Sequence, residues 1–446
     1  MITKNNSPTI LLINPYIHDF AAYDFWAKPL GLLILGGILL QHDYNVEYID
    51  CLDRFHPNNK KNINCKIDGR GSYLKQRIKK PESLFDVSRN YSCYGIPKEW
   101  FIEDLKNINK PDLILITSLM SYWYPGVIET VDILNQIFPD TPIVMGGIYA
   151  SLCYEHALKN FNVNEIIKGP GEPLILDIVS KYTKNFTKSL FDPDDLNTYP
   201  YPALYLQNKI KYVPLLTVRG CPYSCNYCAS SYLTKKIRFR SPDNVIEEIL
   251  FWHKKYSVEN FAFYDDALLI ESEKHAKIIF EKIINLNLQL KFHCPNALHI
   301  KEISFEIANL MFKAGFETIR LGLETSDFDS RDDFKVNYNN FINALNNLKK
   351  SGFNKNQIGA YLLAGCPEQK IEQICRSIEF VKNADIQPVL AYYSPIPHTQ
   401  MWSRAKLSSR YDLESDPIYT NNSIFPCQKE NFSWEKINMF KKILNN

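Results

Sequence analysis

Three cysteines, Cys221, Cys225 and Cys228, lie within eight residues in the stretch RGCPYSCNYCAS. Cysteine thiolates bind zinc or iron–sulfur clusters. A purely structural zinc site uses four ligands, and no fourth Cys or His follows closely; Cys294 or Cys366 would have to supply it through the fold. A cluster held by three thiolates instead leaves one iron open, where a further ligand can bind, as at the open position of a catalytic zinc site.

The cysteines follow the first strand of a region in which strands and helices alternate. Apolar runs such as YVPLLTVRG and NFAFYDD indicate strands, and runs such as PDNVIEEILFWHKKY indicate helices. Six strand–helix units follow one another between residues 212 and 400. This order predicts a second α/β domain, a partial (β/α)6 barrel. Barrel folds carry their chemistry at the carboxyl ends of the strands, where these cysteines lie.

The spacing Cys221-x-x-x-Cys225-x-x-Cys228, after a strand that opens a partial barrel, resembles the radical S-adenosylmethionine (radical SAM) enzymes. The resemblance extends over residues 212–400. It implies a 4Fe–4S cluster on the three cysteines, with the amino and carboxylate groups of S-adenosylmethionine (SAM) on the fourth iron. An electron from the reduced cluster would cleave the sulfonium carbon–sulfur bond and generate a 5′-deoxyadenosyl radical, while the protein orients the reactants.

The same resemblance implies residues that contact SAM. Tyr227 stands where the family commonly places an aromatic side chain near the adenine. Asp265 and Asp266 end the second strand, near the family's polar contacts to the methionine amino group; adjacent carboxylates also suit a turn or a helix cap. Glu324 ends the fourth strand, where the similar stretch contacts the ribose or the amino group, with an exposed strand-end carboxylate as the alternative. His398 is either a substrate-facing acid or base or an ordinary turn residue.

The first 182 residues also alternate strands with helices. Five apolar runs indicate strands, at residues 9–14, 45–50, 111–118, 141–147 and 163–169. They predict a doubly wound, flavodoxin-like parallel sheet, in which ligands sit at the carboxyl ends of the strands. Residues 54–100 interrupt this pattern with a basic stretch, either a solvated insertion or a loop that binds a phosphate or a nucleotide tail. Residues 183–211 indicate a linker, and residues 401–446 form an extension with weak periodicity.

A doubly wound domain before such a barrel is similar to the cobalamin-binding domain of the cobalamin-dependent radical SAM branch; the stretches ILLINP, IVMGGIYAS and EIIKGPGE carry the resemblance. It implies that small strand-end residues admit the corrin and its nucleotide tail. The implied contacts are Thr117, Ser118, Gly146, Gly147 and Gly169. The hexapeptide Asp-x-His-x-x-Gly, which supplies a histidine to cobalt in some such domains, does not occur. Its absence predicts cobalt without that ligand, or a domain that has lost the cofactor.

The other cysteines of the first domain raise the alternative of a second cluster. Methylthiotransferases carry one on a domain of similar topology, and its first cysteine follows strand one. Here Asn14 and Pro15 occupy that place. The cysteines of this domain are therefore predicted to be small buried residues or free thiols: Cys51, Cys65, Cys93 and Cys153.

The composition is that of a globular chain, 45% hydrophobic and 22% charged over 446 residues, long enough for two or three domains. The net charge of +2 gives no indication of a nucleic-acid partner. The apolar run PLGLLILGGILL is shorter than the roughly 20 residues that a membrane span needs, and the N-terminal residues lack a signal-peptide pattern. We therefore expect a cytoplasmic protein whose eleven cysteines are thiols and metal ligands.

The expected reaction is methyl transfer to an unactivated carbon. The deoxyadenosyl radical would remove a hydrogen atom, and methylcobalamin would deliver the methyl group. Radical rearrangement, cyclisation or oxidation without methyl transfer is the first alternative, and a non-catalytic metal-binding scaffold is the alternative from another class. A reductant such as flavodoxin or ferredoxin would supply the electron. The sequence leaves the substrate open between a small molecule and a peptide.

Overall fold

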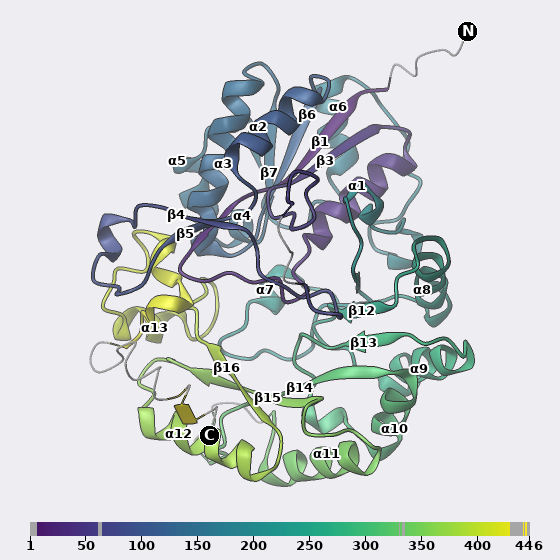
Figure 1. The fold of residues 1–446 in the computed structure, drawn as a ribbon, viewed down its shortest axis with the longest axis vertical. Coiled ribbons are helices and arrows are strands. Elements are labelled where there is room, and N and C mark those ends of the chain that lie inside the picture. The colour runs from purple at the N-terminus through teal and green to yellow at the C-terminus, as the bar shows by residue number, and fades with distance from the viewer. Residues whose placement is uncertain are drawn as a thin grey trace. The chain divides into compact units, whose positions relative to one another are not determined.

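Apolar strands and the helices between them build two main parallel sheets, one in each half of the chain (Figure 1). The computed structural model describes residues 7–60, 65–329, 331, 335–428, 440, 442 and 443. Contacts divide the chain into two units: Met1–Ile210 with Asp416–Ile418, and Lys211–Ser415 with Tyr419–Asn446. The N-terminal unit thus takes in the predicted linker up to residue 210.

The N-terminal unit is built on a five-stranded sheet of order β3-β1-β6-β7-β8. All neighbouring strands pair in parallel, which confirms the predicted doubly wound sheet. The strands are β1 (Thr9–Asn14), β3 (Asn45–Asp50), β6 (Leu113–Ser118), β7 (Ile143–Gly147) and β8 (Glu165–Ile166).

Helices cover both faces of this sheet. Successive side chains of a strand point to opposite faces, so Leu11 and Ile13 of β1 enter one core cluster together with Val127 of helix α3. On the other face, α1 approaches so closely that a Cβ at Gly36 would lie 2.8 Å from Leu12 Cδ1. The helices are α1 (Leu30–Gln41), α2 (Lys98–Asn107), α3 (Tyr124–Ile137), α4 (Ile148–Leu152), α5 (Tyr154–Asn160) and α6 (Ile175–Thr183).

The interruption between β3 and β6 contains ordered structure in its described part. Strands β4 (Lys75–Arg77) and β5 (Ser92–Tyr94) pair antiparallel with β2 (Ile17–Asp19) and form a small sheet of order β2-β5-β4. Leu84 and Tyr91 of this segment are buried. Scattered apolar residues among the basic ones therefore anchor this part of the insertion, and its role stays a prediction.

The second unit is built on six parallel strands of order β16-β15-β14-β13-β12-β9. Among the described residues no pairing joins β16 to β9, so the sheet is an open, partial barrel, as predicted. Its strands are β9 (Val213–Leu215), β12 (Asn260–Phe263), β13 (Lys291–His293), β14 (Phe316–Glu324), β15 (Ile358–Ala364) and β16 (Gln387–Tyr392).

Phenylalanines fill the space between these strands and the helices outside them. Phe263 of β12 stacks on Phe316 of β14 with ring centroids 5.6 Å apart, and Phe261 stacks on Phe292 at 5.6 Å. Helices α9 to α12 lie along the outer side of the sheet (Figure 1). The helices are α8 (Pro242–Tyr256), α9 (Ala276–Asn285), α10 (Phe305–Ala314), α11 (Tyr338–Lys350) and α12 (Ile371–Asn383).

The extension after residue 400 begins with the short helix α13 (Trp402–Ser408). Met401, Ala405 and Cys427 of this extension form a buried cluster with Tyr393, and Tyr227 packs against it. The extension therefore belongs to the surroundings of the cysteines. In the described part of the chain, no helix has the length and apolarity that spanning a membrane requires.

Candidate functional site

The three cysteines lie on one excursion of the chain, residues 220–237, which we call the cysteine loop. It leaves β10 (Val218–Arg219) and returns along β11 (Arg238–Phe239), and these strands pair antiparallel and close its base. Gly220 starts the loop at φ +96°, and a Cβ there would lie 3.0 Å from the carbonyl oxygen of Lys236. Glycine suits this position because it adopts a positive φ without strain.

Cys221, Cys225 and Cys228 form no disulfide and are partly exposed. Burial, followed by the neighbouring Asp266, Cys225 and Cys228, raises the pKa of Cys221. Cys221 Sγ lies 3.7 Å from His299 Nε2. The ligands of one zinc ion lie about 3.8 Å apart, given Zn–S bonds of about 2.3 Å. Among the described residues, three His, Cys or carboxylate donors lie within 4.8 Å of one another at a different place, formed by His18, Cys93 and Glu129. The three thiols of the cysteine loop are not such a set, and thiolates are the ligands that a cluster takes on its different irons.

Asp266 lies beside the last of the three cysteines. Its Oδ1 accepts a hydrogen bond from the Ser230 hydroxyl at 3.3 Å, and that hydroxyl lies 3.3 Å from Cys228 Sγ. Burial raises the pKa of Asp266, while Ser230 and the Gly220 backbone oppose the shift. A carboxylate is therefore available at the edge of the cysteine loop. Its contact with SAM stays a prediction.

Asp265 has a different setting. It is 3% exposed, and its Oδ1 accepts hydrogen bonds from the backbone nitrogen and the hydroxyl of Thr217 at 2.9 and 2.6 Å and from the backbone nitrogen of Val218. Burial raises the pKa of Asp265 to about 6, although these hydrogen bonds oppose the shift. The carboxylate is thus engaged with the backbone before the cysteine loop, and its predicted contact with SAM is untested.

Tyr227 and Glu324 meet at a cavity of about 270 Å³ in the barrel unit. Burial, the Glu324 carboxylate and the Cys225 thiol raise the pKa of Tyr227 far above its usual value. Glu324 closes β14 at φ +65° and lies 3.6 Å from Lys335 Nζ. The structure therefore brings these two predicted SAM contacts together. Their roles toward SAM stay predictions.

Sequence reasoning missed most of the residues that line this cavity. Arg331 follows a strand end, and Met401 and Arg404 belong to the extension whose weak periodicity gave no signal. Arg404 pairs with Glu368 at 2.9 Å. The other lining residues are Asn226, Thr325, Leu363, Cys366, Pro367, Gln369 and Gln373. His398 lies outside this set and stacks on Tyr232 of α7 (Ser230–Leu233), with centroids 4.2 Å apart.

The predicted cobalamin contacts lie at the carboxyl edge of the N-terminal sheet. Thr117 pairs with Gly146 and Ser118 with Gly147 at the ends of β6 and β7. Ser118 is fully buried, and its hydroxyl donates to the Gly146 carbonyl at 2.7 Å. Gly169 lies at φ +96° with no atom within 4 Å of an added Cβ. Space for a ligand thus exists at Gly169, whereas Ser118 holds the two strands together.

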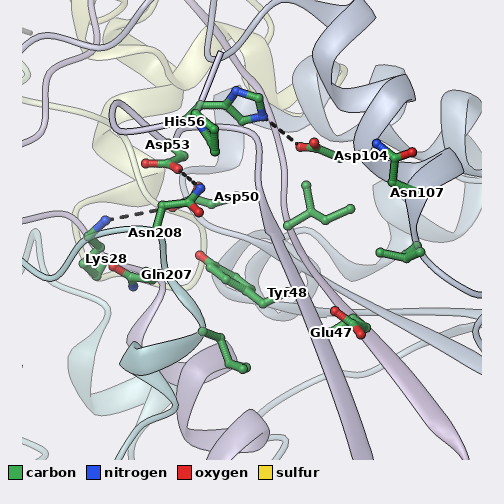
Figure 2. Close-up of a pocket in the computed structure, with 14 residues that line it drawn as sticks. Lys28, Glu47, Tyr48, Asp50, Asp53, His56, Asp104, Asn107, Gln207 and Asn208 are labelled. Atoms are coloured by element: carbon green, nitrogen blue, oxygen red, sulfur yellow. Dashed lines mark hydrogen bonds and ion pairs between the residues drawn. The ribbon is translucent and has the colours of Figure 1, made fainter. Parts of the chain in front are cut away.

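A second cavity, of about 240 Å³, lies beside edge strand β3 (Figure 2). Polar side chains line it and bond mainly to each other: His56 contacts Asp104 at 3.1 Å, and Asn208 donates to Asp53 at 2.7 Å. Lys28 Nζ lies 3.9 Å from the Asp50 carboxylate. None of the five predicted cobalamin contacts lines this cavity.

The set of three donors noted above lies at His18, Cys93 and Glu129. His18 Nε2 lies 2.9 Å from the Glu129 carboxylate, and Lys98 forms an ion pair with the same carboxylate. Burial alone would raise the pKa of Glu129, but the hydrogen bonds from His18 and Lys98 lower it to about 2. These groups pair with one another, so we interpret the set as a partly buried polar cluster.

Comparison with known sequences decides the class of the protein. The profile of the Radical SAM superfamily matches residues 215–381. The chain carries a radical SAM domain. The resemblance predicted from Cys221, Cys225 and Cys228 is thereby confirmed. A radical SAM domain implies an enzyme rather than a non-catalytic scaffold, with a 4Fe–4S cluster and SAM as its cofactors.

Its relatives include proteins named as methyltransferases. An uncharacterised methyltransferase of Pyrococcus horikoshii is 24% identical over 347 residues, which are 70% of this chain and 73% of the relative. Cytidylyl-2-hydroxyethylphosphonate methyltransferase of Streptomyces wedmorensis is 20% identical over 71% of this chain and 65% of its own length. Hopanoid C-2 methylase of Rhodopseudomonas palustris is 23% identical over 61% of this chain and 53% of its own length.

The radical SAM methyltransferase TsrM of Kitasatospora setae has a similar solved structure. In its complex with cobalamin and a [4Fe–4S] cluster, it superimposes with a TM-score of 0.64 and 14% identity, over 90% of this chain and 75% of TsrM. At this identity the likeness concerns the fold. Since it covers 90% of the chain, both the doubly wound unit and the partial barrel share the fold of TsrM.

Proposed function

We propose that this radical SAM enzyme is a cobalamin-dependent C-methyltransferase that acts on an unactivated carbon of a small molecule or peptide. We further propose that it works in the cytoplasm with flavodoxin or ferredoxin as its reductant. Cobalamin, when bound, would carry the methyl group. Cys221, Cys225 and Cys228 would hold the cluster, and Tyr227, Asp265, Asp266 and Glu324 would surround SAM.

The observation that carries the proposal is the shape of the strand ends in the N-terminal unit. An added Cβ would meet only Ile167 Cβ at 3.9 Å at Gly146, and no atom within 4 Å at Gly169. Large apolar side chains stand exposed after the same strands: Met120 is 47% exposed, Ile148 41% and Leu174 40%. Exposed apolar surface beside open backbone suits a broad, partly apolar ligand such as a corrin.

The comparisons support the same proposal. TsrM, with which the chain shares its two-part fold, is described with cobalamin and a cluster bound. The names of the relatives include methyltransferases and a hopanoid C-2 methylase. A domain that kept the fold but lost cobalamin would not explain the open glycines and the exposed apolar side chains together.

One relative favours a second candidate function, radical ring closure without methyl transfer. Anaerobic magnesium-protoporphyrin IX monomethyl ester cyclase of Rubrivivax gelatinosus is 23% identical over 250 residues, 49% of this chain and 44% of its own length. Both candidates use the cluster and SAM. They differ in the fate of the SAM methyl group, which stays on methionine in a cyclisation.

The test combines corrin analysis with an isotope label. The full chain is purified anaerobically after expression with cobalamin, and the extracted corrin is quantified. It is then incubated with a low-potential reductant, methyl-labelled SAM and candidate metabolite extracts. Bound corrin near one per chain and label in a product support the proposal. Absence of bound corrin, or an unlabelled product formed together with 5′-deoxyadenosine, contradicts it and favours the second candidate.

A further inference from the structure

Hydrogen bonds to the side chains of Asp265 and Arg240 fix residues 216–218, which lead into the cysteine loop. Asp265 Oδ1 accepts hydrogen bonds from the backbone nitrogen and the hydroxyl of Thr217 and from the backbone nitrogen of Val218. The carbonyl of Leu216 accepts a hydrogen bond from Arg240 Nη1 at 3.3 Å. Residues 216–219 form the stem that enters the loop. Two charged side chains, of Asp265 and Arg240, therefore bind this stem in addition to its strand pairing.

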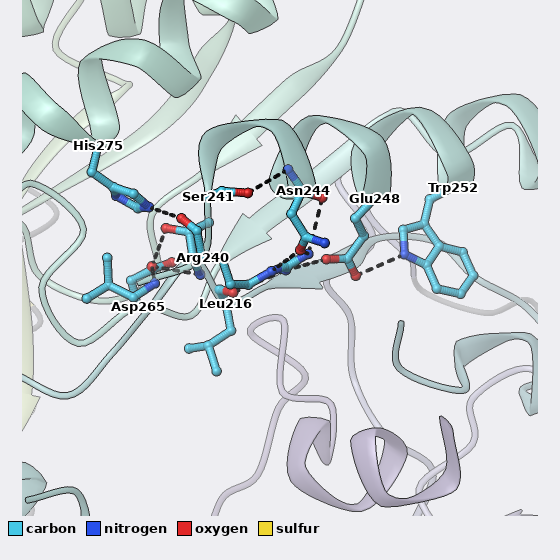
Figure 3. A network of polar contacts seen from close by, with 10 residues as sticks. Leu216, Arg240, Ser241, Asn244, Glu248, Trp252, Asp265 and His275 are labelled. Atoms are coloured by element: carbon cyan, nitrogen blue, oxygen red, sulfur yellow. Dashed lines mark hydrogen bonds and ion pairs between the residues drawn. The ribbon is translucent and has the colours of Figure 1, made fainter. Parts of the chain in front are cut away.

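The stem that leaves the loop is β11 with Arg240, which directly follows it. Arg240 therefore fixes this second stem as well. Its backbone nitrogen donates to the Thr217 carbonyl at 2.9 Å, which joins the two stems. Its guanidinium donates to Asn244 Oδ1 at 2.6 and 2.8 Å and to Glu248 Oε2 at 2.5 Å, both on α8 (Figure 3). Its carbonyl lies 3.0 Å from His275 Nε2. One side chain thus ties both stems to a long helix.

Burial makes these contacts hard to replace. Asp265 is 3% exposed, and the side chains of Arg240 and Glu248 are 11% and 2% exposed. Trp252 Nε1 donates to the second oxygen of Glu248 at 3.2 Å and fixes its orientation. Deleting one partner of such a set leaves buried donors or charges unpaired, which costs more than the net worth of the lost bond.

We propose that Asp265 and Arg240 are positioning residues that fix both stems of the cysteine loop, so that its three thiols are preorganised for the cluster. Binding a ligand with a mobile loop costs conformational entropy, and fixed stems reduce that cost. This gives Asp265 a role through the backbone of Thr217 and Val218, and it replaces the contact with SAM that was proposed for Asp265 above. The inference concerns the radical SAM domain and holds whether or not the enzyme transfers methyl groups.

The test uses the full chain and two readouts besides activity. In the cluster-free protein, Asp265→Ala is expected to raise amide hydrogen exchange of residues 216–220 at least tenfold. After anaerobic reconstitution, it is expected to release iron to a chelator at least fivefold faster. Arg240→Lys is expected to behave similarly, because an ammonium cannot reproduce the planar fork that spans Asn244 and Glu248. Asp265→Asn keeps an acceptor oxygen and should recover most of both readouts.

Asn260→Ala is the matched control. It breaks a buried contact of the same strand β12, between Asn260 Oδ1 and His293 Nε2 at 3.1 Å, away from the stems. It should lower the unfolding temperature and leave both readouts unchanged. Equally faster amide exchange and iron release in this control would overturn the proposal, because the effect would then be global.

Two results for Asp265→Ala would also overturn the proposal. One is amide exchange and iron release at the wild-type rates. The other is weaker SAM binding, which would make Asp265 a direct contact of SAM. Should Asp265→Ala not fold, Glu248→Gln takes its place with the same expectations.

Discussion

The backbone nitrogen of Met401 donates a hydrogen bond of 2.8 Å to the backbone carbonyl of Asn226. Asn226 lies in the cysteine loop between Cys225 and Cys228, and Met401 opens the C-terminal extension. Both residues line the cavity that also holds Tyr227 and Glu324. The extension is therefore a wall of the candidate SAM site.

This contact predicts the effect of Met401→Pro. Proline has no N–H, so the variant loses the hydrogen bond to Asn226, a net loss of about 1 kcal/mol. SAM should then bind the cluster-loaded enzyme about fivefold more weakly. Met401→Leu keeps the N–H and a similar volume and is the control. Equilibrium dialysis with labelled SAM measures both, and equal affinities in the two variants would show that the contact does not shape the site.

The strand ends of the N-terminal unit predict the effect of Gly146→Ala. The added methyl group meets only Ile167 Cβ at 3.9 Å, so the unfolding temperature should stay within about 3 °C of wild type. If a corrin lies against this backbone, the methyl group should lower cobalamin affinity about tenfold, a loss of about 1.4 kcal/mol. Absorbance titration measures the affinity.

Gly31→Ala is the control for this prediction. Gly31 lies on the exposed side of α1 with no atom within 4 Å of an added Cβ, and alanine should stabilise the helix by roughly 1 kcal/mol. Cobalamin affinity should not change in this variant. A Gly146→Ala protein that binds cobalamin like wild type would place the corrin elsewhere.

The cluster of Glu129, His18 and Lys98 predicts a pH dependence of stability. The pKa of Glu129 is lowered to about 2 from an ordinary 4.5. The native state therefore releases the proton more readily than the unfolded state, and the stabilisation is complete above pH 4.5 and lost as the pH falls towards 2. With a discount for partial exposure of the pair, it amounts to about 2 kcal/mol.

Glu129→Gln tests this dependence by chemical denaturation at several pH values. The variant should be less stable than wild type at pH 7, and the difference should shrink as the pH falls below 4.5. A difference that stays constant from pH 7 to the lowest pH at which the protein folds would assign the effect to packing.

Much of the fold was predictable because its signals are local. The apolar run at 9–14 matches β1, and residues 242–256 match α8, where Ser241 caps the first turn and Pro242 occupies the first position. The cysteine spacing indicates a candidate site for the same reason, since all three cysteines lie on one loop.

The parts that escaped prediction depend on distant contacts. Strand β4 has three exposed residues and exists because it pairs with β5. Two short helices, α4 and α5, follow β7 and are separated at Cys153, a break that no local pattern marks. Met401 and Arg404 reach the cavity beside Tyr227 from the far end of the chain, and no local pattern announces such a contact.

The central claim is that Cys221, Cys225 and Cys228 hold the cluster at which SAM is reductively cleaved. The most direct measurement is 5′-deoxyadenosine formed from SAM under a low-potential reductant, in anaerobically reconstituted wild type, Cys225→Ala and Cys375→Ala. Cys375 is a partly exposed cysteine of α12 outside the site. The account predicts deoxyadenosine from wild type and Cys375→Ala and none from Cys225→Ala. Equal deoxyadenosine from Cys225→Ala and wild type, or none from wild type, would contradict it.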